Sequence, residues 1–175
     1  GGNFKLLCTM EDKGKIFDVK LIYGLTIVIS GVILFWVLTI VYGKIVGFIE
    51  AFPINNYLLY LLFTIITTAS IYIFQHSLSM IFMNQAIPFF VGVIGEFTGL
   101  FSMFLPQFPF LRKSILWGYY GALQFVGLFG WDKQTRFDNA YFGVMTIDWP
   151  AFALLVCLLI LIYIVGKYIF SKKEF

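Results

Sequence analysis

Residues 51–95 read AFPINNYLLYLLFTIITTASIYIFQHSLSMIFMNQAIPFFVGVIG and contain no Asp, Glu, Lys or Arg. A single helix of that length, at about 1.5 Å per residue, would be roughly twice as long as the hydrocarbon core of a bilayer is thick. The chain must therefore turn back, and MNQAIP at 83–88 is the place, because two amides interrupt the apolar run and the proline disfavours helix in the residue before it. We expect two membrane helices, Tyr57 to Met83 and Ile87 to Leu105, joined by a tight hairpin.

The composition of the whole chain is typical of an integral membrane protein. Its hydrophobic fraction is 61%, its charged fraction is 12% and its mean hydropathy is +0.92, all outside the usual range of soluble domains. The apolar segments are continuous and do not alternate, which argues against a β-barrel. The net charge of +3 is too small to require nucleic acid as a partner. Cys8 and Cys157 fall in a predicted loop and a predicted span, so neither a disulfide nor a metal site is expected.

Two further apolar runs complete the predicted fold. Residues 21–43 form an uncharged run between Lys20 and Lys44. Residues 150–170, which follow the interfacial Trp149, form a second apolar run whose one charged residue is Lys167. We therefore expect an all-α integral membrane protein with four transmembrane helices.

The first twenty residues form a separate polar segment before the transmembrane domain. They mix four lysines with acidic and apolar side chains, and residues 12–15 have the pattern of a turn or helix break. We expect a cytoplasmic amphipathic segment at 1–20, although a solvated linker is an equally good interpretation, and a transmembrane domain at 21–175. An external region, 106–149, separates the last two spans.

The external region contains an aromatic stretch, 114–131, that is long enough to span but is not expected to do so. Its four glycines and its aromatic side chains favour a re-entrant or interfacial helical segment. With four spans, both basic ends of the chain lie on one side of the membrane, the cytoplasmic side by the positive-inside rule, whereas a fifth span would separate them. Arg112 and Lys113 disagree with this arrangement, because it places them outside.

Three polar residues inside the predicted spans need partners. Gln75 and His76 lie in the second span, and Glu96 is the carboxylate in the middle of the third. An ionised carboxylate at the bilayer centre costs about 2.5 to 3.5 kcal/mol, so Glu96 faces the bundle interior or a cavity, or is protonated. It is either a functional residue or a structural partner of His76 or Gln75. For His76 a structural hydrogen bond to a neighbouring helix is favoured over a proton relay or ligand site.

The sequence contains no recognisable catalytic motif. It has no GxxxxGK[ST] loop, no HExxH and no GxSxG, and its single His excludes a centre with several His ligands. No catalytic, cofactor-binding or metal-ligating residue is nominated, and the chain is not expected to be an enzyme.

The order of parts is distinctive. A basic amphipathic segment with NFKLL at 3–7 and KIFDVKL at 15–21 precedes a span, a hairpin pair, an aromatic external segment with GWDKQTR at 130–136, and a last span that ends in KKEF. This arrangement resembles the ABC-2 type transporter permeases, and most of all the permease subunits of lantibiotic and bacteriocin immunity exporters. The family usually has six spans, so the resemblance implies that a missing pair precedes Gly1, which agrees with a start that has no Met.

The resemblance also implies the partners of the chain. The first segment would dock on a cytoplasmic ABC ATPase subunit that binds and hydrolyses ATP, and a second permease, identical or paralogous, would complete an exporter of an amphiphilic peptide in a bacterial plasma membrane. The implied ATPase-coupling residues are Phe4, Lys5, Leu7, Glu11, Lys13, Lys15 and Ile16. The candidate external contacts to the substrate are Trp117, Tyr119, Tyr120 and Trp131.

Two other functions remain open from the sequence. A membrane-embedded enzyme or proton-coupled carrier would use Glu96 and His76 and would lose its activity when they are replaced. A small membrane scaffold would tolerate these changes and would have no ATPase partner. The substrate and the direction of transport are not specified by the sequence.

Overall fold

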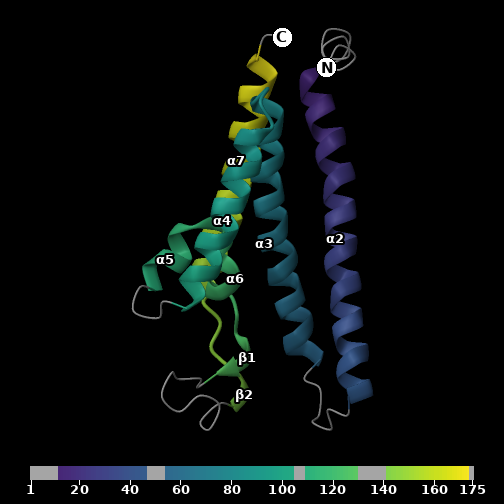
Figure 1. Cartoon of the computed structure of the whole chain (residues 1–175), viewed down its shortest axis with the longest axis vertical. Coiled ribbons are helices and arrows are strands. Elements are labelled where there is room, and N and C mark those ends of the chain that lie inside the picture. Colours follow the sequence, from purple (N-terminus) through teal and green to yellow (C-terminus); the bar gives the residue numbers. More distant parts are fainter. Residues whose placement is uncertain (1–11, 47–53, 105–108, 130–140, 174–175) are drawn as a thin grey trace.

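The computed structural model describes residues 12–46, 54–104, 109–129 and 141–173, which form an elongated helical bundle (Figure 1). Within these ranges four helices are long and apolar enough to cross a membrane. Successive long helices run in opposite directions, so the described chain begins and ends at the same end of the bundle (Figure 1). We call this the basic end, after Lys13, Lys15, Lys20, Lys167, Lys172 and Lys173. The four long helices are α2 (Lys13–Val46), α3 (Ile54–Ile81), α4 (Ala86–Phe104) and α7 (Trp149–Lys172).

Helix α2 begins where the sequence predicted a break. The side chain of Asp12 accepts a hydrogen bond from the backbone N–H of Gly14 at 2.8 Å, and the Asp12 carbonyl accepts one from Ile16 at 3.1 Å. Asp12 is therefore an N-cap, a role that short carboxylate side chains fill well. The helix then continues without interruption across the predicted boundary at residue 20, so residues 13–20 form the first turns of α2.

Helices α3 and α4 form the predicted hairpin, with bounds that differ from the predicted ones by a few residues. The connecting turn is held by its two amides. The Asn84 side chain accepts from the N–H of Ala86 at 3.0 Å, and the Gln85 amide donates to the carbonyls of Ser79 and Phe82, each at 3.1 Å. These bonds satisfy groups that a helix end leaves without a partner. The hairpin therefore closes without any charged residue.

Helix α7 packs along α3. It starts at an N-cap, Asp148, whose side chain accepts from the N–H of Ala151 at 3.0 Å, and Pro150 occupies its first turn. The contact with α3 is close at Gly166, because a Cβ atom placed there would lie 2.7 Å from the Cβ of Ser77. Small residues at such crossings let two backbones approach each other.

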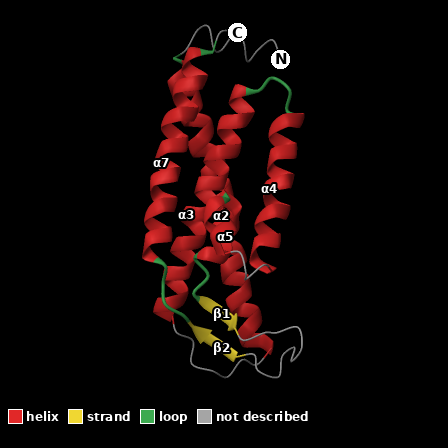
Figure 2. Ribbon diagram, turned by 90° about the vertical axis from the view of Figure 1, so that its left-hand side faces the viewer, coloured by secondary structure: helices red, strands yellow, loops and turns green. Residues whose placement is uncertain are grey.

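Between α4 and α7 the described residues, 109–129 and 141–148, form short elements and no further long helix. They are α5 (Pro109–Ser114), the 3-10 turn η1 (Leu116–Gly118), α6 (Tyr119–Ala122), β1 (Val126–Phe129) and β2 (Tyr141–Val144). Within 114–129, the described part of the aromatic stretch, there is no helix long enough to cross a membrane, and the re-entrant or interfacial position stays a prediction. The antiparallel ribbon of β1 and β2 was not predicted; it lies at the end of the bundle opposite the basic end (Figures 1 and 2). Its pairing brings Val126 opposite Val144.

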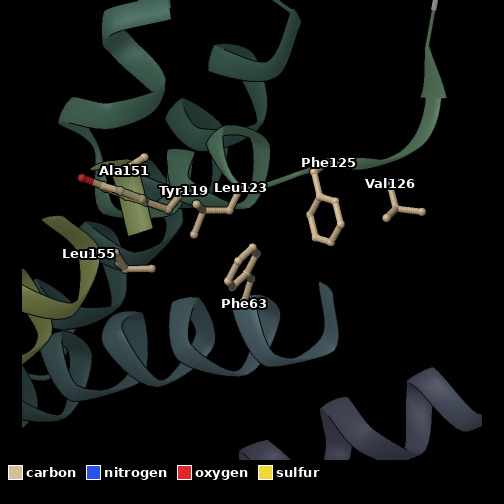
Figure 3. Packing of buried hydrophobic residues seen from close by; sticks show 7 residues of the cluster. All are labelled: Phe63, Tyr119, Leu123, Phe125, Val126, Ala151 and Leu155. Atoms are coloured by element: carbon tan, nitrogen blue, oxygen red, sulfur yellow. The ribbon is translucent and has the colours of Figure 1, made fainter. Parts of the chain in front are cut away.

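Two apolar clusters hold the bundle, one near each end. The first lies at the basic end and contains Phe17 of α2, Ile73 of α3 and Phe170 of α7. The second joins the short elements to α3 and α7, and its buried side chains are Phe63, Tyr119, Leu123, Phe125, Val126, Ala151 and Leu155 (Figure 3).

Candidate functional site: a tied basic end and two grooves beside α3

At the basic end, α2 and α7 are joined by an ion pair with a shared tyrosine. Lys167 Nζ lies 2.6 Å from Asp18 Oδ2, and the Tyr163 hydroxyl donates to Asp18 Oδ1 at 2.9 Å. Lys167 Nζ also donates to the Tyr163 oxygen at 3.2 Å. Tyr163 and Lys167 are one helical turn apart, which places both beside the same carboxylate. Sequence reasoning missed this cluster, because the residues are far apart in the chain.

Lysines also connect the last turns of α3 and α7. Lys173 Nζ donates to the carbonyl of Ile81 at 2.7 Å, and Lys13 Nζ donates to the carbonyl of Lys173 at 2.7 Å. A cation at the C-terminus of a helix satisfies free carbonyls and opposes the negative end of the helix dipole. The N-terminus of α2 and the C-termini of α3 and α7 are therefore held as one unit.

His76 belongs to this unit. Its Nε2 forms a 3.2 Å hydrogen bond with the carbonyl oxygen of Phe17. Because a carbonyl oxygen only accepts, Nε2 carries the proton. The Phe17 ring meets the imidazole edge to face with ring centres 4.7 Å apart, and Tyr72 stacks on it at 6.0 Å. The imidazole is buried among these groups. This is the structural hydrogen bond to a neighbouring helix that the sequence favoured for His76.

Gln75 lies on another side of α3 and bonds to α4. In the orientation that satisfies both amide atoms, its nitrogen donates to the carbonyl of Pro88 at 3.0 Å and its oxygen accepts from the N–H of Gly92 at 3.1 Å. Gly92 leaves room for this contact, because a Cβ there would lie 2.7 Å from the amide atom that faces it, which is the Gln75 oxygen in this orientation. Gln75 therefore joins the two helices of the hairpin.

A groove of about 440 Å³ lies between α3 and α4 and contains Glu96. Gln75 and Gly92 line it together with Phe97 and Trp117. Glu96 is exposed, and among the described residues it makes no hydrogen bond or ion pair with His76, with Gln75 or with any other residue. Of the alternatives for Glu96, pairing with His76 or Gln75 is not seen among the described residues, and its side chain lines an open groove.

Trp117 reaches this groove because the short elements fold back against α4. Its ring lies on Gly95, where an added Cβ would be 2.6 Å from ring atoms, and its own Cβ lies on Gly99 at the same hypothetical distance. The segment is therefore anchored beside the middle of α4 and not only at its end. Trp117 was predicted as an external contact, and its position next to Glu96 follows from the two glycines.

Arg112 and Lys113, which follow α4 at the far end of the bundle, both have partners. The Arg112 guanidinium donates to the carbonyls of Ser102 at 3.0 Å and Met103 at 2.8 Å, so it caps the C-terminus of α4. Lys113 pairs with Asp148, the N-cap of α7, and its hydrogen bond holds the pKa of Asp148 below the usual carboxyl value. These positive charges, which disagreed with the predicted topology, thus have structural roles.

A second groove of about 440 Å³ separates α2 from α3. It is lined by Gly31 and Trp36 of α2 and by Thr68 of α3, and the Tyr120 hydroxyl closes one side by a 2.8 Å hydrogen bond to Thr68. Tyr120, a predicted external contact, therefore lines a groove inside the bundle. Tyr119 does not, because its side chain is fully buried, and its hydroxyl has no hydrogen-bond partner among the described residues.

The predicted coupling residues are described only in part. Phe4, Lys5, Leu7 and Glu11 lie outside the described residues, as does Trp131. Lys15 is exposed in the first turn of α2. Ile16 is buried, only 8% exposed, in the cluster at the basic end. Ile16 is therefore part of the core in this structure and is not free to enter a cleft of another protein.

The arrangement offers no obvious metal centre. Within residues 12–46, 54–104, 109–129 and 141–173, no group of three or more His, Cys, Asp or Glu side chains is placed to hold an ion. Comparisons with known protein families, with curated proteins and with solved structures find no match.

Proposed function

We propose that this chain is the membrane-spanning permease subunit of an ATP-driven exporter of the ABC-2 type, with ATP hydrolysis on a separate cytoplasmic subunit. The observation that carries the proposal is that both described chain ends meet at one basic end. By the positive-inside rule this end faces the cytoplasm, and the α5–β2 region faces outward. The membrane would be a bacterial plasma membrane, and the cargo an amphiphilic peptide, as the resemblance implies.

The tied basic end suits the coupling role. A force applied at the start of α2 reaches α7 through the Asp18–Lys167 pair and α3 through the His76 contact. The three helix ends would therefore move together when an ATPase subunit changes shape. The proposed docking surface consists of the predicted residues before α2 together with exposed Lys15, and it leaves out the buried Ile16.

The arrangement of His76 and Glu96 gives no support to the carrier or enzyme. His76 bonds to α2, whereas Glu96 lies in the groove between α3 and α4. A proton relay requires groups within hydrogen-bond reach of each other or of a bridging water. We therefore do not advance that function.

The test is co-purification of the full chain from its native membranes in a mild detergent. We expect a nucleotide-binding subunit to be captured, and we expect Lys15→Glu combined with Phe4→Asp to abolish the capture. Lys44→Glu is the matched control, because it reverses a charge at the opposite end of α2 and should leave the complex intact. Purification without any ATP-binding protein, or equal capture by all variants, would contradict the proposal.

A further inference from the structure

The groove between α3 and α4 has the chemistry of a site for a cation. Its walls are apolar and aromatic, from Ile71, Phe89, Val93, Phe97 and Trp117, and its acidic group is Glu96. A volume of about 440 Å³ falls in the range of small-molecule sites. Aromatic faces attract cations through their quadrupole, and a carboxylate nearby adds a direct charge.

Glu96 is the feature that requires an occupant. It lies near the middle of α4, a helix that carries no other charged residue, and its side chain is exposed. No described residue offers it a cation: Lys167 is paired with Asp18, Lys113 with Asp148, and Arg112 with carbonyls at the end of α4. An ionised carboxylate that faces lipid without a partner is unfavourable by a few kcal/mol.

Contacts of Gln75 and Trp117 with α4 fix the walls of the groove. Both polar atoms of the Gln75 amide form hydrogen bonds to α4, at Pro88 and Gly92. Gln75 therefore fixes the spacing of the two helices and does not pair with Glu96. Trp117 is held by close contact with Gly95 and Gly99, so the aromatic wall is fixed as well. The site is therefore formed before any ligand arrives, which reduces the ordering cost of binding.

We propose that the α3–α4 groove binds the cationic group of a lipophilic ammonium compound, with Glu96 as its counter-ion and Phe97 and Trp117 as its aromatic walls. The apolar body of the ligand lies along the exposed face of α4 toward its N-terminus, where Phe89 and Ile94 project. This proposal rests on the proposed export function for the idea that the ligand is cargo. Binding itself requires no ATPase subunit.

The experiment measures binding to the full chain in nanodiscs of uncharged phosphatidylcholine. The probe is an alkyltrimethylammonium with bromine on its chain, which quenches Trp117 on contact, and the comparison probe is the neutral bromoalkyl alcohol of the same length. Partitioning into empty nanodiscs is subtracted. We expect the cation to bind about tenfold more tightly than the alcohol, the factor that one partly desolvated charge pair provides. The part of the quenching that comes from Trp117 is the difference between the wild-type chain and Trp117→Phe, which keeps Trp36, Trp131 and Trp149.

Two pairs of variants separate the charge from the aromatic wall. Glu96→Gln keeps the shape of the side chain and should remove the tenfold preference, whereas Asp12→Asn deletes a carboxylate at the basic end, preserves the N-cap, and should change nothing. Phe97→Leu should weaken cation binding about two- to fivefold. Phe101→Leu changes an equally exposed side chain outside the groove and should not.

Equal affinity for the two probes, or an unchanged preference in Glu96→Gln, would overturn the proposal and would mean that Glu96 is protonated or covered by another helix. Because Glu96 and Phe97 are exposed, their variants should fold, and circular dichroism with size exclusion checks this. Cation binding without a co-purifying ATPase would leave the site standing and refute the exporter. An ATPase complex without a preference for the cation would support the exporter and refute the cation site.

Discussion

The contact between Gly166 of α7 and Ser77 of α3 gives the sharpest test of the packing. A Cβ at residue 166 would lie 2.7 Å from the Cβ of Ser77, and it would clash with the Ser77 hydroxyl as well. Rotating the hydroxyl away would break its 2.8 Å hydrogen bond to the carbonyl of Ile73, and no rotation moves Cβ. Gly166→Ala must therefore push α3 and α7 apart.

The expected magnitude is a difference between two effects. Overpacking a tight contact costs about 1 to 3 kcal/mol, and alanine in place of glycine inside a helix returns about 1 kcal/mol. We expect Gly166→Ala to lower the free energy of unfolding by up to about 2 kcal/mol. Gly31→Ala is the control, because nothing lies within 4 Å of a Cβ at that position, so it should stabilise by up to about 1 kcal/mol.

The measurement is reversible unfolding in mixed micelles, followed by far-UV circular dichroism. Ser77→Gly combined with Gly166→Ala removes the Cβ and hydroxyl from α3 and adds a Cβ to α7. This double variant should recover most of the stability that Gly166→Ala loses. The coupling between the two sites in this double-mutant cycle should be of the order of 1 kcal/mol. If Gly166→Ala is as stable as Gly31→Ala, or if Ser77→Gly gives no rescue, the close α3–α7 contact is refuted.

Three smaller predictions concern polar groups. Lys167→Met and Asp18→Asn should each cause only a small loss of stability, because ion pairs between solvent-accessible side chains contribute little. The double variant should lose no more than either single variant, and additive losses in the same assay would argue against the pair. The hydrogen bond from Lys113 lowers the pKa of Asp148. The stability from this pair is therefore present above the ordinary carboxyl pKa of about 4 and is lost as the pH falls through the lowered value. Asp148→Asn should show a flatter acid unfolding profile. Tyr119→Phe removes a buried hydroxyl without a described partner and should raise the melting temperature or leave it unchanged; a clear loss would reveal a hidden hydrogen bond.

The sequence was sufficient to predict the long helices, because each is a continuous apolar run with clear ends. At the start of α2 the sequence was ambiguous. Asp12 followed by Gly14 indicates either a break or a helix N-cap, and only the hydrogen bond from the Gly14 N–H distinguishes the two. The β1–β2 ribbon was missed because aromatic and glycine residues at 126–129 suit an interfacial helix as well as a strand.

The candidate sites were predictable only as single residues. The sequence nominated Gln75, Glu96 and Trp117 for separate reasons, and the structure places all three along one groove. Which residues pair is a property of helix rotation, which periodicity does not fix in helices that are apolar on all sides. The Asp18–Lys167 pair shows the same limit, since only the shared end of the two helices could be inferred from the topology.

Glycine positions explain why these helices pair as they do. Between membrane helices there is little hydrophobic driving force, so close van der Waals contact decides the partners. Gly24 of α2 receives the end of Tyr72 from α3, and Gly95 of α4 receives the indole of Trp117. No atom lies within 4 Å of a Cβ placed at Gly31, which lines the α2–α3 groove. Helix α2 is therefore held by contacts before and after this groove. A bulky side chain at Gly31 would therefore fill this groove without disturbing the fold, whereas the same change at Gly24 would separate the two helices.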